Sequence, residues 1–316
     1  MLKRRFFSMK KINLFIFSLI FIALNFSCKE KISPVFLILS EEDFADCIDV
    51  SDFNSTHAQN YDTKELEAIK QQNFSDVLVS LNGFQLGYWK LPCTIPLLPN
   101  YSDRNYVRVI PCVRTPHLTL TTVQYHFVTP IEEFFDMTPG GEYRLSNKKL
   151  KYLQSVEFPI LETFSQSTLF GPRDSIHPVT IQIVYDNDLK KDIGKISLSG
   201  NELFFDIATS YFTLLGRGER QFWEISYKTT NGQMITHLNF ESDIVGNYNR
   251  DMAVLPSTKG NWKKIYIDIA DVVMQVSYTA PQISVRLNIT GLKEKENQDA
   301  EFYFENIKLI TMMAPY

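Results

Sequence analysis

The chain has 316 residues, a formal net charge of −4 and hydrophobic residues at 44% of its positions. This length exceeds that of a usual single domain, so we expect two domains. The acidic balance, together with the lack of any Lys- or Arg-rich run after Lys31 that could form a basic patch, excludes nucleic acid as an electrostatic partner. An aromatic share of 13%, mostly in alternating patterns, favours β structure.

The first 28 residues have the layout of an export signal. A basic head precedes an apolar run from Ile12 to Phe26, and charge returns at Lys29. The apolar run is too short to be a convincing membrane span. A second methionine, Met9, begins a more compact version of the same signal, so either Met1 or Met9 can be the start.

The segment Leu24-Asn25-Phe26-Ser27-Cys28 resembles the lipobox of Bacteroidota lipoproteins, although Phe26 departs from the strict pattern of small residues. The resemblance covers only the leader. It implies a signal peptide over residues 1–27 and acylation of Cys28, with palmitate among the acyl groups. Each buried methylene of such chains contributes about 0.8 kcal/mol of membrane affinity. The protein would then be anchored to the outer membrane, facing the cell surface or the periplasm. The alternative is an ordinary cleavage site before an unmodified cysteine.

Loss of residues 1–27 leaves 27 basic against 36 acidic residues, a net charge of −9. The mature chain then has three further cysteines, Cys47, Cys93 and Cys112, in a compartment that permits disulfides. A disulfide between Cys93 and Cys112 would close a small loop and stabilise the fold by about 3 kcal/mol. Three buried free thiols are the equal alternative, and Cys47 stays unpaired in both.

Residues 28–33 form a short charged tether before a first apolar strand at residues 35–39. Asp62 and Glu65 have the spacing of a helix capping box. Two β-rich runs then flank Asn82-Gly83, a pair that tolerates the positive φ of a two-residue hairpin turn. More short strands follow without a long helix, so residues 34–145 predict an immunoglobulin-like β-sandwich.

Turn residues and lysines between positions 138 and 151 indicate a domain boundary at residues 140–155. Eight strands are expected beyond it. In the strand at residues 283–289, Ile and Val side chains share one face and polar side chains the other. This pattern over residues 155–316 predicts a two-sheet jelly roll, and the fold class is all-β.

The segments 261–268 and 302–309, the second reading Phe-Tyr-Phe-Glu-Asn-Ile-Lys-Leu, give residues 155–310 a pattern that resembles galactose-binding-like and carbohydrate-binding jelly-roll domains. The tandem of two sandwiches behind a lipobox resembles cell-surface lipoproteins of Bacteroidota. Related jelly rolls often hold a structural calcium ion. Asp186 and Asp188 offer hard oxygens for Ca²⁺, although an ordinary turn is the favoured interpretation of this segment.

The sequence contains no H-E-x-x-H, G-x-S-x-G or Walker motif and no paired C-x-x-C, and its five histidines are scattered. Carboxylates cluster at residues 132–136 and 241–243, which leaves a glycoside hydrolase as the least favoured class. We therefore expect no catalytic residue, no enzyme activity and no cofactor apart from the calcium alternative.

The polar loop at residues 242–251 supplies the most exposed set of binding groups, which combine a ring with hydrogen-bonding side chains: Asn247, Tyr248, Asn249 and Arg250. Trp89, Trp223 and Trp262 lie in or beside expected strands and are expected to be core residues. Around Ser175, the triplet Asp-Ser-Ile resembles the O-glycosylation acceptor used in Bacteroidota.

These patterns predict a membrane-anchored lipoprotein that acts as a non-catalytic binding module for a glycan or an envelope protein. The alternative is a structural accessory subunit of an outer-membrane secretion or gliding complex. Its domains would then be spacers and docking surfaces without a small ligand. Glycan binding by residues 29–316 would favour the first hypothesis, and co-purification with a large membrane complex would favour the second.

Overall fold

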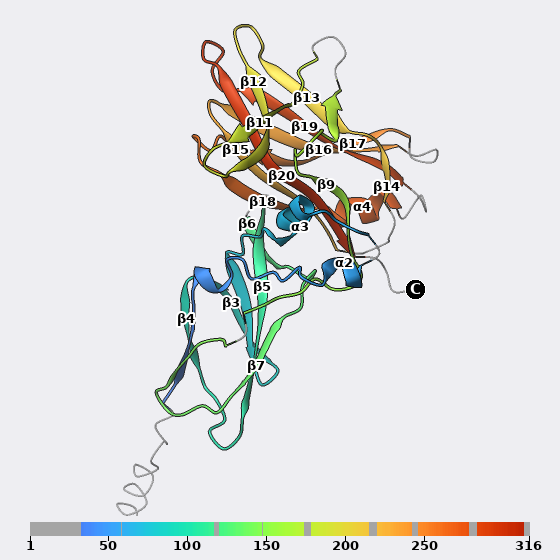
Figure 1. Cartoon of the computed structure of the whole chain (residues 1–316). Helices are drawn as coiled ribbons and strands as arrows, with labels where there is room; N and C mark the ends of the chain where they lie inside the picture. The colour runs from blue at the N-terminus through green and yellow to red at the C-terminus, as the bar shows by residue number, and fades with distance from the viewer. Residues whose placement is uncertain are drawn as a thin grey trace, which may run out of the picture. The chain divides into compact units, whose positions relative to one another are not determined.

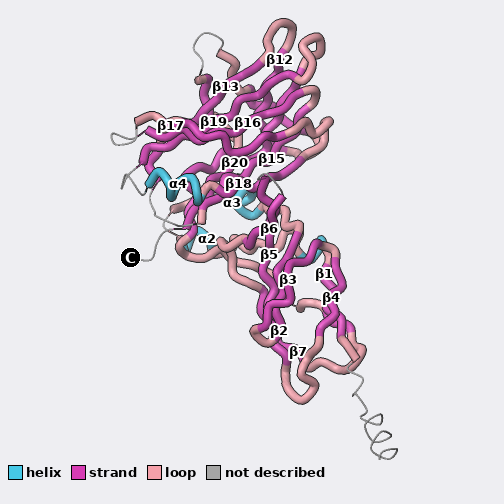
Figure 2. The backbone as a smooth tube through the Cα atoms, turned by 180° about the vertical axis from the view of Figure 1, so that it is seen from behind, coloured by secondary structure: helices cyan, strands magenta, loops and turns pink. Residues whose placement is uncertain are grey.

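The computed structural model describes residues 33–57, 59–116, 120–146, 148–173, 178–214, 220–241, 246–277 and 283–312 (Figure 1). Strands predominate among them, so the predicted all-β class is confirmed (Figure 2). The leader, Cys28 and Ser175 lie outside the described residues. Within the described part, no helix is long and apolar enough to cross a membrane.

The elements of the N-terminal half are β1 (Val35–Leu39), η1 (Glu41–Asp43), α2 (Phe53–Thr56), α3 (Thr63–Lys70), β2 (Asp76–Leu81), β3 (Phe84–Lys90), β4 (Cys93–Leu97), β5 (Asn105–Pro116), β6 (Leu120–Gln124), β7 (Ile131–Phe135) and β8 (Glu142–Tyr143). The predicted capping box is confirmed, because the side chain of Asp62 accepts from the N–H of Glu65 at the start of α3. The predicted hairpin is confirmed as well, with φ of 51° at Asn82 and 82° at Gly83.

The remaining elements are β9 (Val156–Glu162), β10 (Phe170–Pro172), β11 (Gln182–Asp186), β12 (Lys191–Leu198), β13 (Phe204–Thr209), β14 (Phe212–Leu214), β15 (Gln221–Thr229), β16 (Gly232–Glu241), β17 (Tyr248–Leu255), β18 (Lys263–Asp268), α4 (Ala270–Ser277), β19 (Ile283–Lys293) and β20 (Ala300–Met312). Helix α4 was not expected from the sequence.

The chain divides into two compact units. The smaller unit comprises residues 1–38, 94–105 and 134–144, and its described part holds the sheet β4-β1-β8, in which β1 and β8 are parallel. The larger unit comprises residues 39–93, 106–133 and 145–316, and all surfaces considered below lie in it. It includes the sheet β3-β2-β5-β6, which is extended by β7 beside β5.

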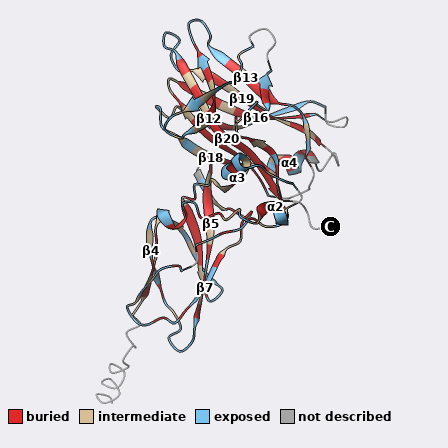
Figure 3. Ribbon diagram, viewed as in Figure 1, coloured by how far each residue is buried: buried red, intermediate tan, exposed pale blue. Residues whose placement is uncertain are grey.

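Two six-stranded sheets form the β-sandwich predicted for the C-terminal part. The β19 sheet has the order β10-β13-β19-β16-β17, with β14 also paired to β19. The β20 sheet has the order β11-β12-β20-β15-β18, with β9 also paired to β20. Their inner faces carry the buried apolar core, which appears as red bands along the strands in Figure 3. On β19 the predicted inward face is confirmed, since Ile283, Val285, Leu287 and Ile289 are all buried.

Two glycines allow large rings to pack in this core. An added Cβ at Gly232 would lie 2.3 Å from Cζ of Phe302, and one at Gly291 would lie 2.0 Å from Cε1 of Phe205. The two rings meet edge to face, with centroids 4.9 Å apart. Both positions therefore require the absence of a side chain for steric reasons, without any need for positive φ.

The predicted domains, with a tether at 28–33, a first sandwich at 34–145 and a jelly roll at 155–316, stay a prediction. Part of the first predicted domain packs closely against the second, because α3 and Tyr125 belong to the same compact unit as the jelly roll. The hydroxyl of Tyr125 donates to Glu224 of β15 at 2.6 Å.

The thiols of Cys47, Cys93 and Cys112 are free in the structure, with Cys47 and Cys112 buried and Cys93 partly exposed, and a disulfide between Cys93 and Cys112 stays a prediction. Cys112 lies opposite Asp76 of β2, and β3, which leads to Cys93, lies on the other side of β2. Cys93 itself begins β4, which belongs to the sheet of β1. Burial raises the pKa of Cys112 to about 12 and that of Cys93 to about 11.

Candidate functional site

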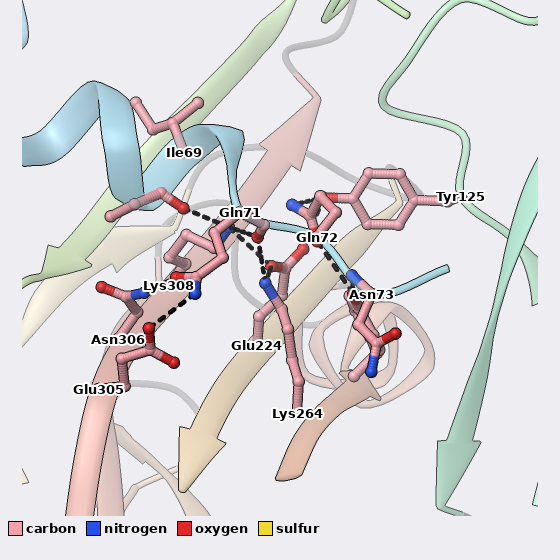
Figure 4. A network of polar contacts seen from close by, with 12 residues as sticks. Ile69, Gln71, Gln72, Asn73, Tyr125, Glu224, Lys264, Glu305, Asn306 and Lys308 are labelled. Atoms are coloured by element: carbon pink, nitrogen blue, oxygen red, sulfur yellow. Dashed lines mark hydrogen bonds and ion pairs between the residues drawn. The ribbon is translucent and has the colours of Figure 1, made fainter. Parts of the chain in front are cut away.

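A buried charge cluster lies on the outer face of the β20 sheet, beneath α3 (Figure 4). It consists of Glu224 on β15, Lys308 on the neighbouring β20 and Lys264 on β18, the strand on the other side of β15. Oε2 of Glu224 lies 3.0 Å from Nζ of Lys308 and 3.3 Å from Nζ of Lys264. The side chains of Glu224 and Lys308 are 1% exposed and that of Lys264 is 7% exposed, so water screens these charges very little.

The two lysines also hold the C-terminal end of α3. Lys308 donates to the carbonyl oxygens of Ala68 at 3.0 Å and Gln71 at 3.2 Å, and Lys264 donates to the same carbonyl of Gln71. The last carbonyls of a helix have no partner within the helix and carry partial negative charge. The cluster therefore fixes α3 to the sheet by supplying the cations that this helix end needs.

Polar side chains complete the cluster. Tyr125 donates to Glu224, while Nε2 of Gln72 donates to the hydroxyls of Tyr125 at 2.9 Å and Tyr152 at 2.8 Å. Tyr266 donates to Oε1 of Gln72 and accepts from the N–H of Asn73. The segment that follows α3 is thereby bonded to the sheet along its length, and the cluster is shielded from solvent.

The protonation of the cluster follows from burial and from its neighbours. Burial opposes the charged form of Glu224, but the attraction of Lys308 and Lys264 outweighs it and lowers the pKa of this carboxyl. Burial and the charge of Lys308 lower the pKa of Lys264 to about 7. Since these charged side chains are at most 7% exposed, the cluster serves to position α3 and does not meet a ligand directly.

The lowered pKa of Lys264 predicts a pH-dependent stability. The unfolded lysine has a pKa near 10.5, so between about pH 7 and pH 10 the unfolded chain binds more protons at this lysine than the folded chain. Lys264 should therefore increase the free energy of unfolding as the pH rises from about 7 to 8. Above this range the thiols of Cys47, Cys93 and Cys112, whose raised pKa values have the opposite effect, begin to titrate in the unfolded chain. Urea unfolding at several pH values measures the slope. A Lys264→Met protein should lose that contribution; an unchanged slope would contradict the assignment.

A cleft of about 550 Å³ opens beside the cluster, between α3, the turn from β11 to β12, and β20. We call it the α3 cleft. Its lining includes four lysines and four acidic residues, together with the amides of Gln71 and Asn306 and the exposed ring of Tyr185. The buried charge cluster, which we call the α3 clamp, also shapes this cleft. Ala68 and Gln71, whose carbonyls accept from Lys308, line the cleft as well.

A second candidate surface is the outer face of the β19 sheet, which we call the polar face. Its cross-strand rows consist of polar side chains, most of them short: Asp206 of β13, His237 and Asn239 of β16, Asn249 and Asp251 of β17, and Arg286, Asn288 and Thr290 of β19. Beside them, the guanidinium of Arg286 lies 4.7 Å from the ring centroid of Tyr211, which is 38% exposed.

Hydrogen bonds between strands order the polar face. Arg286 donates to Oδ1 of Asn239 at 3.3 Å, and Nδ2 of Asn239 donates to Oδ1 of Asn249 at 2.6 Å. Asp206 accepts from Asn288 and Thr290. A separate pair joins Nδ1 of His237 to Asp251 at 2.8 Å. The face is thus preorganised in its polar contacts.

The structure separates the four residues that the sequence analysis grouped in one loop. Asn249 pairs with Asn239 and belongs to the polar face. Tyr248 and Arg250 pair with Phe240 and Leu238, whose side chains face the core, so strand alternation places them on the other side of β17 from Asn249. Asn247 is exposed just before β17. Sequence reasoning missed Tyr211 and Arg286, and the polar side of the alternation in β19 was the available signal.

The predicted calcium alternative at Asp186 and Asp188 lies in a tight turn after β11. Oδ1 of Asp186 accepts from the N–H groups of Asp188 at 2.9 Å and Leu189 at 3.0 Å, and its other oxygen lies 3.4 Å from Nζ of Lys228. These bonds lower the pKa of Asp186 and match the favoured turn interpretation. Among the residues that the structure describes, no group of three or more His, Cys, Asp or Glu side chains could hold a metal ion.

Of the three tryptophans that were expected in the core, Trp223 is fully buried there, whereas Trp262 is partly exposed and has Nζ of Lys228 at 4.8 Å from its ring centroid. Trp89 is also partly exposed, although its Nε1 is buried. Among the carboxylates at residues 132–136, Glu132 pairs with Arg108 at 3.3 Å, and Glu133 accepts from the N–H of Ser146.

No family model matches the chain, and no curated protein matches it. Among solved structures, it is similar to the module pair of an endo-1,4-beta-D-xylanase 10B from Clostridium thermocellum, a carbohydrate-binding module of family 22 with a glycoside hydrolase module of family 10, complexed with xylohexaose. The TM-score is 0.37 and the identity 13%, over 50% of this chain and 29% of that chain.

A xylan-binding family 22 domain from Paenibacillus barcinonensis gives a TM-score of 0.35 at 12% identity, over 51% of this chain and 98% of that domain. A family 11 module of a Clostridium thermocellum cellulase gives 0.30 at 17%, with the same coverages. Each of these three solved structures contains a carbohydrate-binding module.

Proposed function

We propose that the protein is a non-catalytic glycan-binding module and that the polar face of the β19 sheet is its ligand surface. The observation that carries the proposal is the ordered network of Arg286, Asn239 and Asn249 beside the exposed ring of Tyr211. A solvent-exposed sheet face that binds no ligand can carry long, mobile charged side chains and needs no ordered network. Polar side chains that are already bonded to one another lose little conformational entropy when a ligand binds.

The chemistry of the face suits a neutral, hydroxyl-rich ligand. Sugar hydroxyls both donate and accept, and the face offers guanidinium and amide donors next to carboxylate and amide acceptors. Asp206 and Asp251 balance Arg286 and also Arg173, which follows β10 and pairs with Asp206 at 3.4 Å, so the surface has no dominant charge. The ring of Tyr211 supplies an apolar surface for the face of a sugar ring.

The proposal predicts that loss of Arg286 or Tyr211 weakens oligosaccharide binding. Residues 29–316 would be titrated calorimetrically with xylohexaose, mannohexaose and β-1,4-galactotriose. We expect saturable binding to at least one of them and about tenfold weaker binding by Arg286→Ala and Tyr211→Ala, because each removes a contact worth about 1.4 kcal/mol.

Arg250→Ala is the matched comparison, since Arg250 is an exposed arginine on the other side of β17. Unchanged binding by this protein would assign the site to the polar face. If Arg250→Ala and Tyr248→Ala weakened binding while Arg286→Ala did not, the ligand surface would be the loop expected from the sequence. Absence of binding to a broad panel of neutral and charged glycans would contradict a glycan-binding function.

An accessory subunit of an envelope complex is the second candidate, and one observation favours it. Strand β3 is an edge strand, and three of its apolar side chains are exposed: Phe84 by 78%, Leu86 by 38% and Tyr88 by 47%. An apolar edge strand is a site where another chain can add a strand. If Leu86→Lys abolished co-purification of an envelope protein, this function would replace the first.

We further propose that acylation of Cys28 anchors the module to the outer membrane. The layout of the leader supports this proposal. Mass spectrometry of the native N-terminal peptide would show the acyl chains, and Cys28→Ala protein should leave the membrane fraction. Protease treatment of intact cells that carry a C-terminal tag would then show which membrane face it occupies. The O-glycosylation proposed at Ser175 would add mass to the peptide that contains it.

A further inference from the structure

The charges of the α3 cleft are almost all paired. Lys64 of α3 pairs with Asp192 of β12 at 3.5 Å, and Lys70 pairs with Asp46 at 3.5 Å. Lys191 pairs with Glu305 of β20 at 2.5 Å. These three pairs account for six of the eight charged side chains that line the cleft.

The remaining two are Glu67 and Lys190, which form no ion pair with any described residue. Glu67 comes from α3, and Lys190 comes from the turn between β11 and β12. The cleft therefore presents one carboxylate and one ammonium group from two different walls. A ligand with one positive and one negative end would be complementary to both.

Neighbouring contacts hold these two walls in place. Oε1 of Glu305 accepts from Nε2 of Gln71 at 2.6 Å, and Asn306 donates to the side-chain oxygen of Gln71. The carboxylate of Glu305 is thereby fixed opposite Lys191 and does not compete for Lys190. Lys190 itself has φ of 55°, a left-handed conformation that a non-glycine residue adopts only when its surroundings impose it.

We propose that the α3 cleft binds a short peptide with free termini, whose ammonium group pairs with Glu67 and whose carboxylate pairs with Lys190. The site lies outside the polar face and does not depend on glycan binding. Ala68 and Leu189 add small apolar surfaces to the lining of the cleft, which suit compact side chains. Charge-assisted hydrogen bonds at both ends would provide the specificity.

The test uses trialanine as its probe, because its only charges are the two termini. Residues 29–316 would be titrated with trialanine, with N-acetyl-trialanine, which lacks the ammonium group, and with trialanine amide, which lacks the carboxylate. We expect saturable binding of trialanine and about tenfold weaker binding of each capped peptide. Because an extended peptide spans about 3.3–3.6 Å per residue, a series from dialanine to pentaalanine would define the preferred length.

Substitutions assign each terminus to its partner. Glu67→Gln should weaken trialanine binding about tenfold but leave the binding of N-acetyl-trialanine unchanged, because that peptide has no ammonium group to lose. Lys190→Gln should likewise weaken trialanine binding about tenfold but leave the binding of trialanine amide unchanged, because that peptide has no carboxylate to lose. The exposed residues Glu294 and Lys263 provide matched controls, and Glu294→Gln and Lys263→Gln should bind trialanine like the unaltered protein.

Lack of saturable binding by any peptide of the series would overturn the proposal, as would equal binding of free and capped peptides. Oligosaccharide titrations of the same variants separate this site from the polar face. Glu67→Gln and Lys190→Gln should leave oligosaccharide binding unchanged, and Arg286→Ala should leave peptide binding unchanged. The absence of peptide binding would then be distinguishable from the absence of oligosaccharide binding.

Discussion

Replacement of Glu224 by Gln should lower the free energy of unfolding by about 3–5 kcal/mol, because it leaves the buried ammonium group of Lys308, and the protonated fraction of Lys264, without a counter-charge. Nζ of Lys308 and Nζ of Lys264 lie within 3.3 Å of Oε2 of Glu224, and the surrounding residues exclude water. Without the carboxylate, the two lysines repel each other, and at least one must lose its proton or move to solvent. Urea denaturation at pH 7, monitored by tryptophan fluorescence, would measure the loss.

The matched control is Glu301→Gln. Glu301 also pairs with a lysine, Lys195, at 2.7 Å, but its side chain is 37% exposed. A solvent-screened pair contributes about 0–1 kcal/mol, so this substitution should change stability little. If Glu224→Gln were as mild as Glu301→Gln, the cluster would not be the buried ionic clamp that the geometry indicates.

A triple substitution separates the ion pair from the space that it fills. Replacing Glu224, Lys264 and Lys308 together by Met removes every buried charge while roughly keeping the volume, and such exchanges are often neutral or stabilising. The carbonyls of Ala68 and Gln71 would then lose their cations, so amide hydrogen exchange in α3 should accelerate even where global stability is kept. The clamp thus specifies the position of α3 more than it stabilises the sandwich.

The sequence predicted the local elements because their signals are short in range. The Asp62–Glu65 capping box, the Asn82-Gly83 turn and the inward face of β19 each depend on residues a few positions apart. The α3 clamp depends on contacts such as that from Lys308 to Ala68, which are 240 positions apart in the chain. No local sequence pattern indicates which distant segment of the chain will cover a sheet.

A weaker signal for the cluster was nevertheless present. Glu224 stands between Trp223 and Ile225, and Lys308 stands between Ile307 and Leu309. Alternation places such charges on the outer side of a strand, where the usual expectation is solvent. Here α3 and the segment after it cover that side, so the same alternation produces a buried ion cluster.

Alternation also explains why the predicted binding loop was divided. The sequence shows Asn247, Tyr248, Asn249 and Arg250 as one polar group, but from Tyr248 onward the chain is strand β17. Neighbouring residues of a strand point to opposite faces, so only Asn249 reaches the polar face. The loop would have needed to remain irregular for all four side chains to act together.

The second large effect should come from Phe302→Ala, which we expect to lower the free energy of unfolding by about 3–5 kcal/mol through the cavity that it leaves. The ring of Phe302 is fully buried and packs edge to face on Phe205. It also fills the space over Gly232, where an added Cβ would meet the ring at 2.3 Å. Gly232→Ala alone should therefore cost about 1–3 kcal/mol by overpacking.

These two changes should couple, because one creates the space that the other needs. In the Phe302→Ala background, the added methyl group of Gly232→Ala meets no ring, so the double variant should be no less stable than Phe302→Ala alone. Its loss of stability should therefore be smaller than the sum of the losses of the two single variants. Gly171→Ala is the control, since an added Cβ there has no atom within 4 Å, and its effect should stay within about 0.5 kcal/mol. If the losses in free energy of unfolding of the two single variants added up in the double variant, Gly232 would be required for a reason other than contact with the ring of Phe302. Coupling of the expected sign would show that the sandwich core is fixed by the fit of one ring against one missing side chain.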